Sequence, residues 1–181
     1  ILFIGEIMTL YIEFIGRPSA GKSTTAHDVF SKLKQLGLKV EFVSEYAKEL
    51  VYARKFSVLE DQLKVSSEQN FRENILMDQV DFVVTDTSLA LAGVYNKTYC
   101  PEFIESLIEE MRSKKQYITF FVENKKGEYR DYGRTQTAEE AFELEGAILS
   151  DAEYFCNNLH KIDKHGGAEA VINKLKELEL L

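Results

Sequence analysis

Residues 16–23 of the chain read Gly-Arg-Pro-Ser-Ala-Gly-Lys-Ser, a match to the pattern G-x-x-x-x-G-K-[ST]. The match follows a short β-rich, apolar run over residues 10–15, which predicts a buried strand. After it, apolar residues recur at helical spacing up to Leu33, and Gly37 is placed to end that helix. A glycine-containing turn between a strand and a helix is the setting in which this pattern binds phosphate groups. The sequence therefore predicts a phosphate-binding loop.

The residue types of this loop suit the polyphosphate of ATP bound with Mg²⁺. Its glycines let successive backbone N–H groups turn toward one anionic oxygen, and the following helix adds the positive end of its dipole. Lys22 would reach the β- and γ-phosphates, and the Ser23 hydroxyl would bind Mg²⁺. The alternative is a simple strand–helix turn with a solvent-exposed lysine. The residues expected to contact the nucleotide are Gly16, Arg17, Pro18, Ser19, Ala20, Gly21, Lys22, Ser23 and Thr24.

A second magnesium-binding group is expected at the end of a neighbouring strand. Asp86 ends the apolar run over residues 82–84 and is the best candidate, acting directly or through a water, since Mg²⁺ keeps several waters in proteins. The alternative role for Asp86 is to cap the turn over residues 88–91. Asp81 begins the same strand, at the opposite end of the sheet, and is expected to be a turn residue.

The pattern along the rest of the chain alternates strands with helices. Further strands are expected over residues 40–43, 117–122 and 159–162. An amphipathic helix is expected to start at Pro101, and another helix at the capping box formed by Thr137 and Glu140. Between residues 45 and 80 the pattern predicts two helices, broken near residues 56–57. This alternation predicts an α/β fold with a largely parallel sheet.

Composition limits the class of protein. The 181 residues fit one domain, and the formal net charge of −8 argues against a broad nucleic-acid-binding surface. Two cysteines far apart in sequence favour a reducing, cytoplasmic location. Glu6 and Glu13 interrupt the apolar N-terminal stretch, so we expect neither a signal peptide nor a membrane span. The chain does not begin with Met, so residues 1–7 are expected to be upstream or added sequence and residues 8–181 one domain.

A polar, charged segment over residues 123–137 lies between the fourth strand and the capped helix. It carries Arg130 and Arg134, next to Gly133, where a mobile lid of a small-molecule kinase would lie. Guanidinium groups closing over a bound nucleotide would stabilise charge on the transferring phosphoryl group. A solvated charged loop is the alternative. Arg134 is slightly favoured, because the glycine beside it permits a sharp approach.

Four short motifs together resemble the small P-loop kinases related to the ribosylnicotinamide kinase domain of NadR-type proteins, often grouped as an AAA-like ATPase domain and common in phages. They are the loop extended to residues 16–24, Ser-Glu-Tyr-Ala-Lys-Glu over 44–49, Glu-Gln over 68–69 and Thr-Asp-Thr over 85–87. The resemblance covers roughly residues 10–162. Lys48 stands where that family usually has arginine, and the segment Gly133-Arg134-x-Gln136 is more similar to phage nucleotide kinases.

The resemblance implies a three-layer α/β/α P-loop NTPase fold with five parallel strands in the order 2-3-1-4-5, and ATP–Mg²⁺ as phosphoryl donor. The acceptor would lie between the helices after the second strand and the phosphate-binding loop. Glu45 would bind an acceptor hydroxyl or take its proton, whereas a phosphate acceptor would need cations such as Lys48 and Arg54. Gln69 would read a base or amide edge, or be a surface glutamine.

The resulting expectation is an ATP- and Mg²⁺-dependent kinase that transfers the γ-phosphoryl group to a nucleoside or nucleotide. The catalytic candidates are Lys22, Glu45, Asp86, Arg130 and Arg134, with Ser23 and Asp86 on the metal. Two rival functions are an ATP-binding or ATP-hydrolysing switch, and a polynucleotide kinase that acts on DNA or RNA, which the acidic charge disfavours. The identity of the acceptor and the oligomeric state, monomer or homodimer, stay open.

Overall fold

The computed structural model of the chain describes residues 8–124, 129–130, 132 and 135–181. Residues 1–7, expected to be upstream sequence, lie outside the described part. The elements in chain order are β1 (Leu10–Ile15), α1 (Lys22–Gln35), β2 (Val40–Val43), α2 (Tyr46–Tyr52), α3 (Phe56–Leu59), α4 (Gln62–Asn74), β3 (Phe82–Thr85), η1 (Leu89–Leu91), α5 (Ala92–Tyr95), α6 (Pro101–Arg112), β4 (Gln116–Glu123), α7 (Ala138–Phe155), β5 (Leu159–Asp163) and α8 (Gly167–Glu177).

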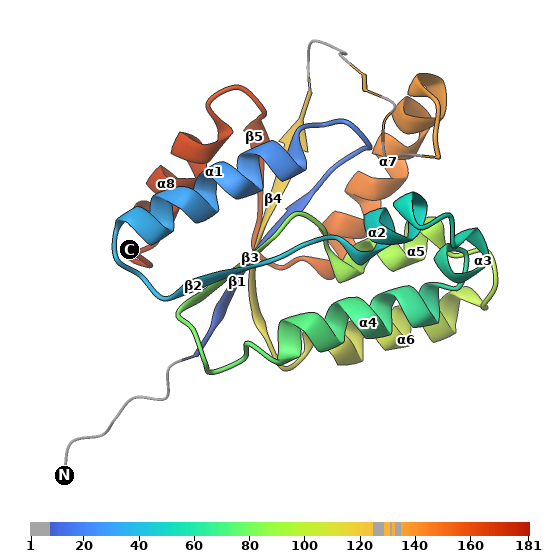
Figure 1. Ribbon diagram of the computed structural model, residues 1–181, viewed down its shortest axis with the longest axis horizontal. Coiled ribbons are helices and arrows are strands. Elements are labelled where there is room, and N and C mark those ends of the chain that lie inside the picture. Colours follow the sequence, from blue (N-terminus) through green and yellow to red (C-terminus); the bar gives the residue numbers. More distant parts are fainter. Residues whose placement is uncertain (1–7, 125–128, 131, 133–134) are drawn as a thin grey trace.

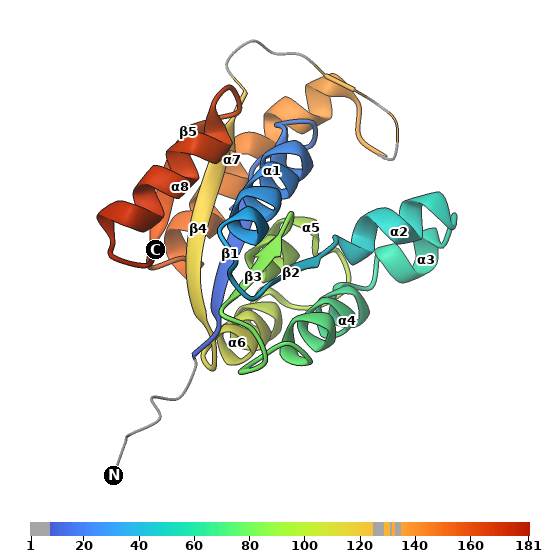
Figure 2. The same ribbon diagram turned by 60° about the vertical axis from the view of Figure 1, so that its left-hand side comes forward.

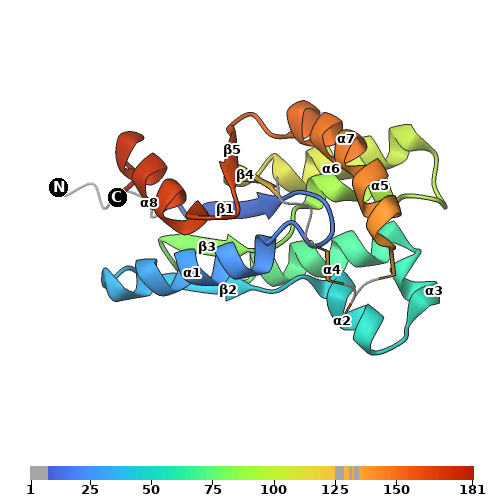
Figure 3. The ribbon, with the colours of Figure 1, turned by 90° about the horizontal axis from the view of Figure 1, so that it is seen from above.

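The strands form one sheet in the order β2-β3-β1-β4-β5, with each neighbouring pair parallel. The expected fold class and strand order are therefore confirmed. Because all strands run the same way, the segments that follow β1, β2 and β3 meet at one edge of the sheet. In Figure 3 the loop after β1 curls beyond the tip of that strand before α1 begins.

Helices cover both faces of the sheet (Figures 1 and 2). Alternate residues of β1 divide between these faces, as the period of a strand requires. Ile12 and Phe14 pack in the core cluster that includes residues of α1 and α8, whereas Ile15 packs with residues of η1 and α7. Tyr11 joins a third cluster with Val43 and Val83. Burial on both faces explains why the strand sequences are nearly continuous apolar runs.

The helix ends follow local signals. Thr137 and Glu140 form the reciprocal capping box at the start of α7, and Pro101 occupies the first turn of α6. Gly37 has a φ of +80° just after α1, as expected for the residue that ends a helix. No helix in the described part of the chain has the length and apolar character needed to cross a bilayer.

The prediction of two helices between residues 45 and 80 is wrong. The chain forms three, α2, α3 and α4, and the last ends at Asn74. Arg54, with a φ of +54°, interrupts the helical path between α2 and α3. The Asp61 side chain caps α4 by accepting from the Lys64 N–H at 3.3 Å. Asp78, with a φ of +60°, turns the chain toward β3. Local backbone turns therefore override the continuous helical pattern.

Candidate active site

The loop between β1 and α1 is built around two glycines with positive φ. Gly16 has a φ of +145°, and a Cβ at this position would lie 2.8 Å from the Val122 carbonyl oxygen of β4. Gly21 has a φ of +104° and precedes the first residue of α1. Both conformations are rare for residues with a Cβ, so the loop needs glycine at these positions. The non-glycine Ser19 is also left-handed, at a φ of +67°.

Lys22 and the neighbouring chain segments hold the loop in place. The Lys22 Nζ donates to the carbonyl oxygens of Gly16 at 2.9 Å and Arg17 at 3.2 Å, which puts the ammonium group across the loop. Ser19 is braced from two sides, because its carbonyl accepts from Asn124 Nδ2 at 3.2 Å and its Oγ accepts from the Arg130 N–H at 2.8 Å. The loop is therefore pre-shaped before a ligand arrives.

Ser23 and Asp86 meet, as the sequence predicted. The Ser23 Oγ donates to Asp86 Oδ2 at 2.5 Å, and the buried Asp86 also accepts from the Glu45 N–H at 3.0 Å. The alternative role of Asp86 as a cap is wrong, because the Ser88 side chain makes that bond by accepting from the Ala90 N–H at 3.1 Å. A hydroxyl and a carboxylate are the hard oxygen ligands that Mg²⁺ takes, so this pair fits the ion beside a nucleotide phosphate.

Glu45 lies just before α2, beside the phosphate-binding loop. Its backbone bond to Asp86 fixes the start of α2 against the end of β3. The next residue, Tyr46, donates its N–H to Gln69 Oε1 at 3.0 Å, so the Glu-Gln pair of α4 also holds this helix. Glu45, Asp86 and Gln69 come from three segments that only the parallel sheet brings together.

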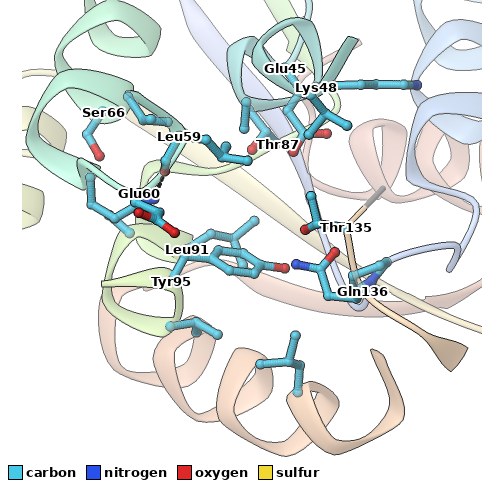
Figure 4. A pocket seen from close by; sticks show the side chains of 18 of the residues that line it. Glu45, Lys48, Leu59, Glu60, Ser66, Thr87, Leu91, Tyr95, Thr135 and Gln136 are labelled. Carbon is cyan, nitrogen blue, oxygen red and sulfur yellow. Dashed lines mark hydrogen bonds between the residues drawn. The ribbon is translucent and has the colours of Figure 1, made fainter. Parts of the chain in front are cut away.

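A cavity of about 670 Å³ opens beside the loop (Figure 4). Its lining includes Lys22 and Glu45, apolar residues of α4 and η1, and Thr135 and Gln136 from the segment before α7. Figure 4 shows Glu45 and Lys48 at one rim and Thr135 and Gln136 at another. The cavity thus joins the predicted phosphate site to a space large enough for a small organic molecule.

Arg17 has a role that the sequence did not reveal. Its side chain is fully buried, stacks over the Phe142 ring at 4.0 Å and donates to the Asn124 carbonyl at 3.2 Å. Glu145 lies 3.7 Å from its Nε. Arg17 is outside the cavity lining, so its guanidinium couples the loop to α7, and only its backbone remains available to the phosphates.

Of the other predicted site residues, some lie at the site and others do not. Arg130 lies beside Ser19 through its backbone, and its side chain is exposed. Arg134 and Gly133 lie outside the described residues. Lys48 lines the cavity, whereas Arg54 is exposed and does not.

The loop after β5 lies beside the start of α1. A Cβ on Gly21 would lie 3.1 Å from the Lys164 Cβ, and one on Gly167 would lie 3.1 Å from Thr25 Cγ2. This segment therefore flanks the phosphate-binding loop on the side of α8.

A parallel sheet in this order, a phosphate-binding loop after β1 and a carboxylate after β3 define a P-loop nucleotide-binding protein with the fold of the small kinases. A family profile described as AAA domain matches residues 11–169, and the chain belongs to this family. The predicted resemblance to a small P-loop, kinase-like AAA domain is confirmed. A comparison with curated protein sequences gave no match.

Two solved structures show the same fold. Thymidylate kinase from Ehrlichia chaffeensis aligns with a TM-score of 0.70 at 15% identity, over 93% of this chain and 99% of that one. Deoxyadenosine kinase from M. mycoides, solved with bound dATP, aligns with a TM-score of 0.61 at 14% identity, over the same shares of the two chains. At these identities the similarity establishes the architecture, and function has to be argued from the site.

Proposed function

We propose that this protein is a kinase that transfers the γ-phosphoryl group of ATP to a small acceptor, a nucleoside or nucleotide. The observation that supports it most directly is that Lys22 and Glu45 line one cavity, beside the Ser23–Asp86 pair. A donor site and an acceptor space therefore share one wall, as direct transfer between two bound substrates requires. The two solved structures compared above are kinases by name, one of a nucleotide and one of a nucleoside.

In this reaction the Lys22 ammonium and the backbone N–H groups of the phosphate-binding loop, apart from Pro18, which has none, bind the donor phosphates. Ser23 and Asp86 would hold Mg²⁺, which when bound offsets negative charge on the β- and γ-phosphate oxygens. An acceptor oxygen forms a bond to the γ-phosphorus as the bond from that phosphorus to the β–γ bridging oxygen breaks, and ADP leaves. When the acceptor is a hydroxyl, Glu45 orients it and takes its proton.

Positive charge near the transferring group is proposed to come from the segment over residues 123–137. Arg130 and Arg134 are the arginines of this segment. Replacement of either by alanine is expected to lower kcat while ATP affinity is retained, because a guanidinium that acts only on the transition state adds little to ground-state binding. Unchanged kcat would remove that arginine from the site.

The test measures ADP formation by the full chain with ATP and Mg²⁺, with and without a panel of nucleosides and monophosphates. A kinase requires an acceptor for stoichiometric turnover, whereas a switch or simple ATPase releases ADP without one. Lys22→Ala should abolish turnover and keep the fold, with the exposed Lys39→Ala as the matched control. Retained turnover in Lys22→Ala would contradict the proposal.

A polynucleotide acceptor is tested separately. Binding of DNA or RNA ends predicts affinity that falls steeply with salt, because condensed counterions are released. The absence of that slope would exclude this rival.

A further inference from the structure

One wall of the cavity carries neutral polar side chains where a core helix would carry apolar ones. Gln62, Ser66 and Gln69 lie on one face of α4, at the i, i+4, i+7 spacing, and all three line the cavity. They are only 6%, 4% and 4% exposed. Polar side chains this deeply buried normally have hydrogen-bond partners. Their position therefore raises the question of what each one is bonded to.

Gln69 is the member whose hydrogen bonding is incomplete. Its Oε1 accepts from the Tyr46 N–H at 3.0 Å, which fixes the amide so that Nε2 is the free end. Among the described residues Nε2 has no hydrogen-bond partner, although it is buried. By contrast, Gln62 Nε2 donates to the Leu59 carbonyl at 3.0 Å. A buried, oriented donor on a cavity wall is suited to an acceptor atom of a ligand.

The apolar part of the cavity lining fits a flat, uncharged ring. Leu59, Val65, Leu89 and Leu91 line the same cavity and supply apolar contact. Aromatic heterocycles combine such faces with a hydrogen-bonding edge. The faces of such a ring would be buried against these apolar side chains, and its polar edge would form a hydrogen bond with an amide.

The charges around the cavity do not favour a phosphate on the acceptor. Besides Lys22, the described lining holds two lysines, Lys48 and Lys97, against four carboxylates. The acidic side chains are Glu45, Glu60, Glu140 and Glu143. A second phosphate beside the γ-phosphate would meet this net negative wall and have to overcome like-charge repulsion.

Arginine, the residue best suited to bind phosphate in two-point geometry, is absent from the described lining. Three arginines close to the site are turned to other partners. Arg17 stacks on Phe142, Arg72 pairs with Glu49 through two bonds, and Arg112 pairs with Glu13. All three guanidinium groups are thus used for structure.

We propose that the acceptor is an uncharged nucleoside, not its monophosphate, and that Gln69 reads the edge of its base. Gln69 Nε2 donates to a carbonyl oxygen or ring nitrogen of the base, while the reacting hydroxyl lies toward Glu45. This assignment rests on the proposed kinase function and narrows its acceptor. Ser66, one turn before Gln69, is the second group placed to contact the base.

The experiment compares each of the common nucleosides with its 5′-monophosphate as acceptor for the full chain with ATP and Mg²⁺. We expect phosphorylation of at least one nucleoside, with a kcat/KM at least tenfold above that of its monophosphate. Preferential phosphorylation of monophosphates would overturn this inference and leave the kinase function standing. Failure to phosphorylate any acceptor, with ADP released at an acceptor-independent rate, would overturn the kinase function itself.

Gln69→Glu tests the donor directly, because the carboxylate can still accept from the Tyr46 N–H but offers no N–H to the base. We expect kcat/KM for the nucleoside to fall by about 10- to 100-fold, mostly through KM, with ATP affinity unchanged. Gln116→Glu, on the exposed start of β4, is the matched control. An unchanged KM in folded Gln69→Glu would overturn the reading role. If Gln69→Glu does not fold, Ser66→Ala and the acceptor comparison serve as the test. The assignment would be refuted if wild type and Ser66→Ala had equal KM values for the nucleoside and the wild type preferred monophosphates.

Discussion

Arg112 and Glu13, 99 residues apart in sequence, form a two-point ion pair inside the protein. Arg112 Nη1 donates to Glu13 Oε2 at 2.9 Å and Nη2 to Oε1 at 2.8 Å, and both side chains are buried. Thr119 of β4 adds a bond to Glu13 at 2.6 Å. Arg112 Nη1 also donates to Ser88 Oγ at 3.1 Å, and Ser88 lines the cavity. The pair therefore ties the strand that carries the phosphate-binding loop to the turn after Asp86.

Breaking this pair should destabilise the fold strongly. Arg112→Leu leaves the Glu13 carboxylate buried without its cation, at an expected cost of about 3–5 kcal/mol in the free energy of unfolding. Urea denaturation followed by circular dichroism measures it. The control is Lys114→Ala, two residues after Arg112, which removes an exposed ion pair with Glu110. This variant should leave the urea midpoint unchanged. Similar midpoints for the two variants would contradict the buried pair.

Gly16→Ala should impair the loop. The added Cβ would lie 2.8 Å from the Val122 carbonyl oxygen in a backbone conformation at a φ of +145°, so the loop must shift. We expect ATP affinity, measured by calorimetry, to fall at least tenfold. Gly146→Ala is the matched control, because a Cβ there meets nothing within 4 Å in the middle of α7. It should keep ATP affinity and gain about 0.5–1 kcal/mol in stability.

Asp86→Asn should raise the Mg²⁺ concentration needed for half-maximal activity and lower kcat by more than tenfold, because one anionic oxygen ligand is lost. The amide oxygen can still accept from the Glu45 N–H, so folding should persist. The control is Asp81→Asn at the other end of β3, where the carboxylate accepts from the Lys39 N–H at 3.0 Å. An equal effect of the two substitutions on the Mg²⁺ dependence would exclude the metal role of Asp86.

The two cysteines should differ in reactivity. Cys100 is exposed, whereas burial, with Glu13 nearby, raises the pKa of the Cys156 thiol to about 12. The thiolate is the reactive form, so iodoacetamide at pH 8 should label one thiol per folded chain within minutes. Cys100→Ser should then label only after denaturation. Rapid labelling of folded Cys100→Ser would show that the packing around Cys156 is wrong.

His160 should contribute a pH dependence of stability. Burial, with Lys174 nearby, lowers the pKa of this imidazole below its ordinary value of 6.5. Below pH 6.5 the unfolded chain therefore binds a proton more readily than the folded chain, and stability falls as the pH drops through this value toward the folded pKa. Between pH 7.5 and 5.5, the free energy of unfolding should fall less steeply in His160→Gln than in the wild type. At pH 8 the imidazole is neutral in both the folded and the unfolded chain, so its protonation should contribute nothing there. Parallel curves for the two proteins would contradict the shift.

Part of the candidate site could be predicted before any coordinates, because the motif and its chemistry lie within nine consecutive residues. The strand order came from a family resemblance, and the pairing of Ser23 with Asp86 from a general property of this loop type. The helices after β2 were harder, because a helical pattern does not show a single left-handed residue such as Arg54. Gln69 is an intermediate case: its base-reading role was one of two possibilities in the sequence, and its buried, unpartnered Nε2 is a property of the folded chain.

By itself, the sequence determined an α/β chain with a phosphate-binding loop, since strand and helix periods and glycine spacing act over a few neighbouring residues. Only the tertiary structure decided that Arg17 faces Phe142, that Arg112 pairs with Glu13 and that Gln69 accepts from the Tyr46 N–H. These contacts join residues 23 to 125 positions apart. Which buried polar group meets which depends on strand order and helix packing, because burial forces polar groups to find partners wherever the chain brings them.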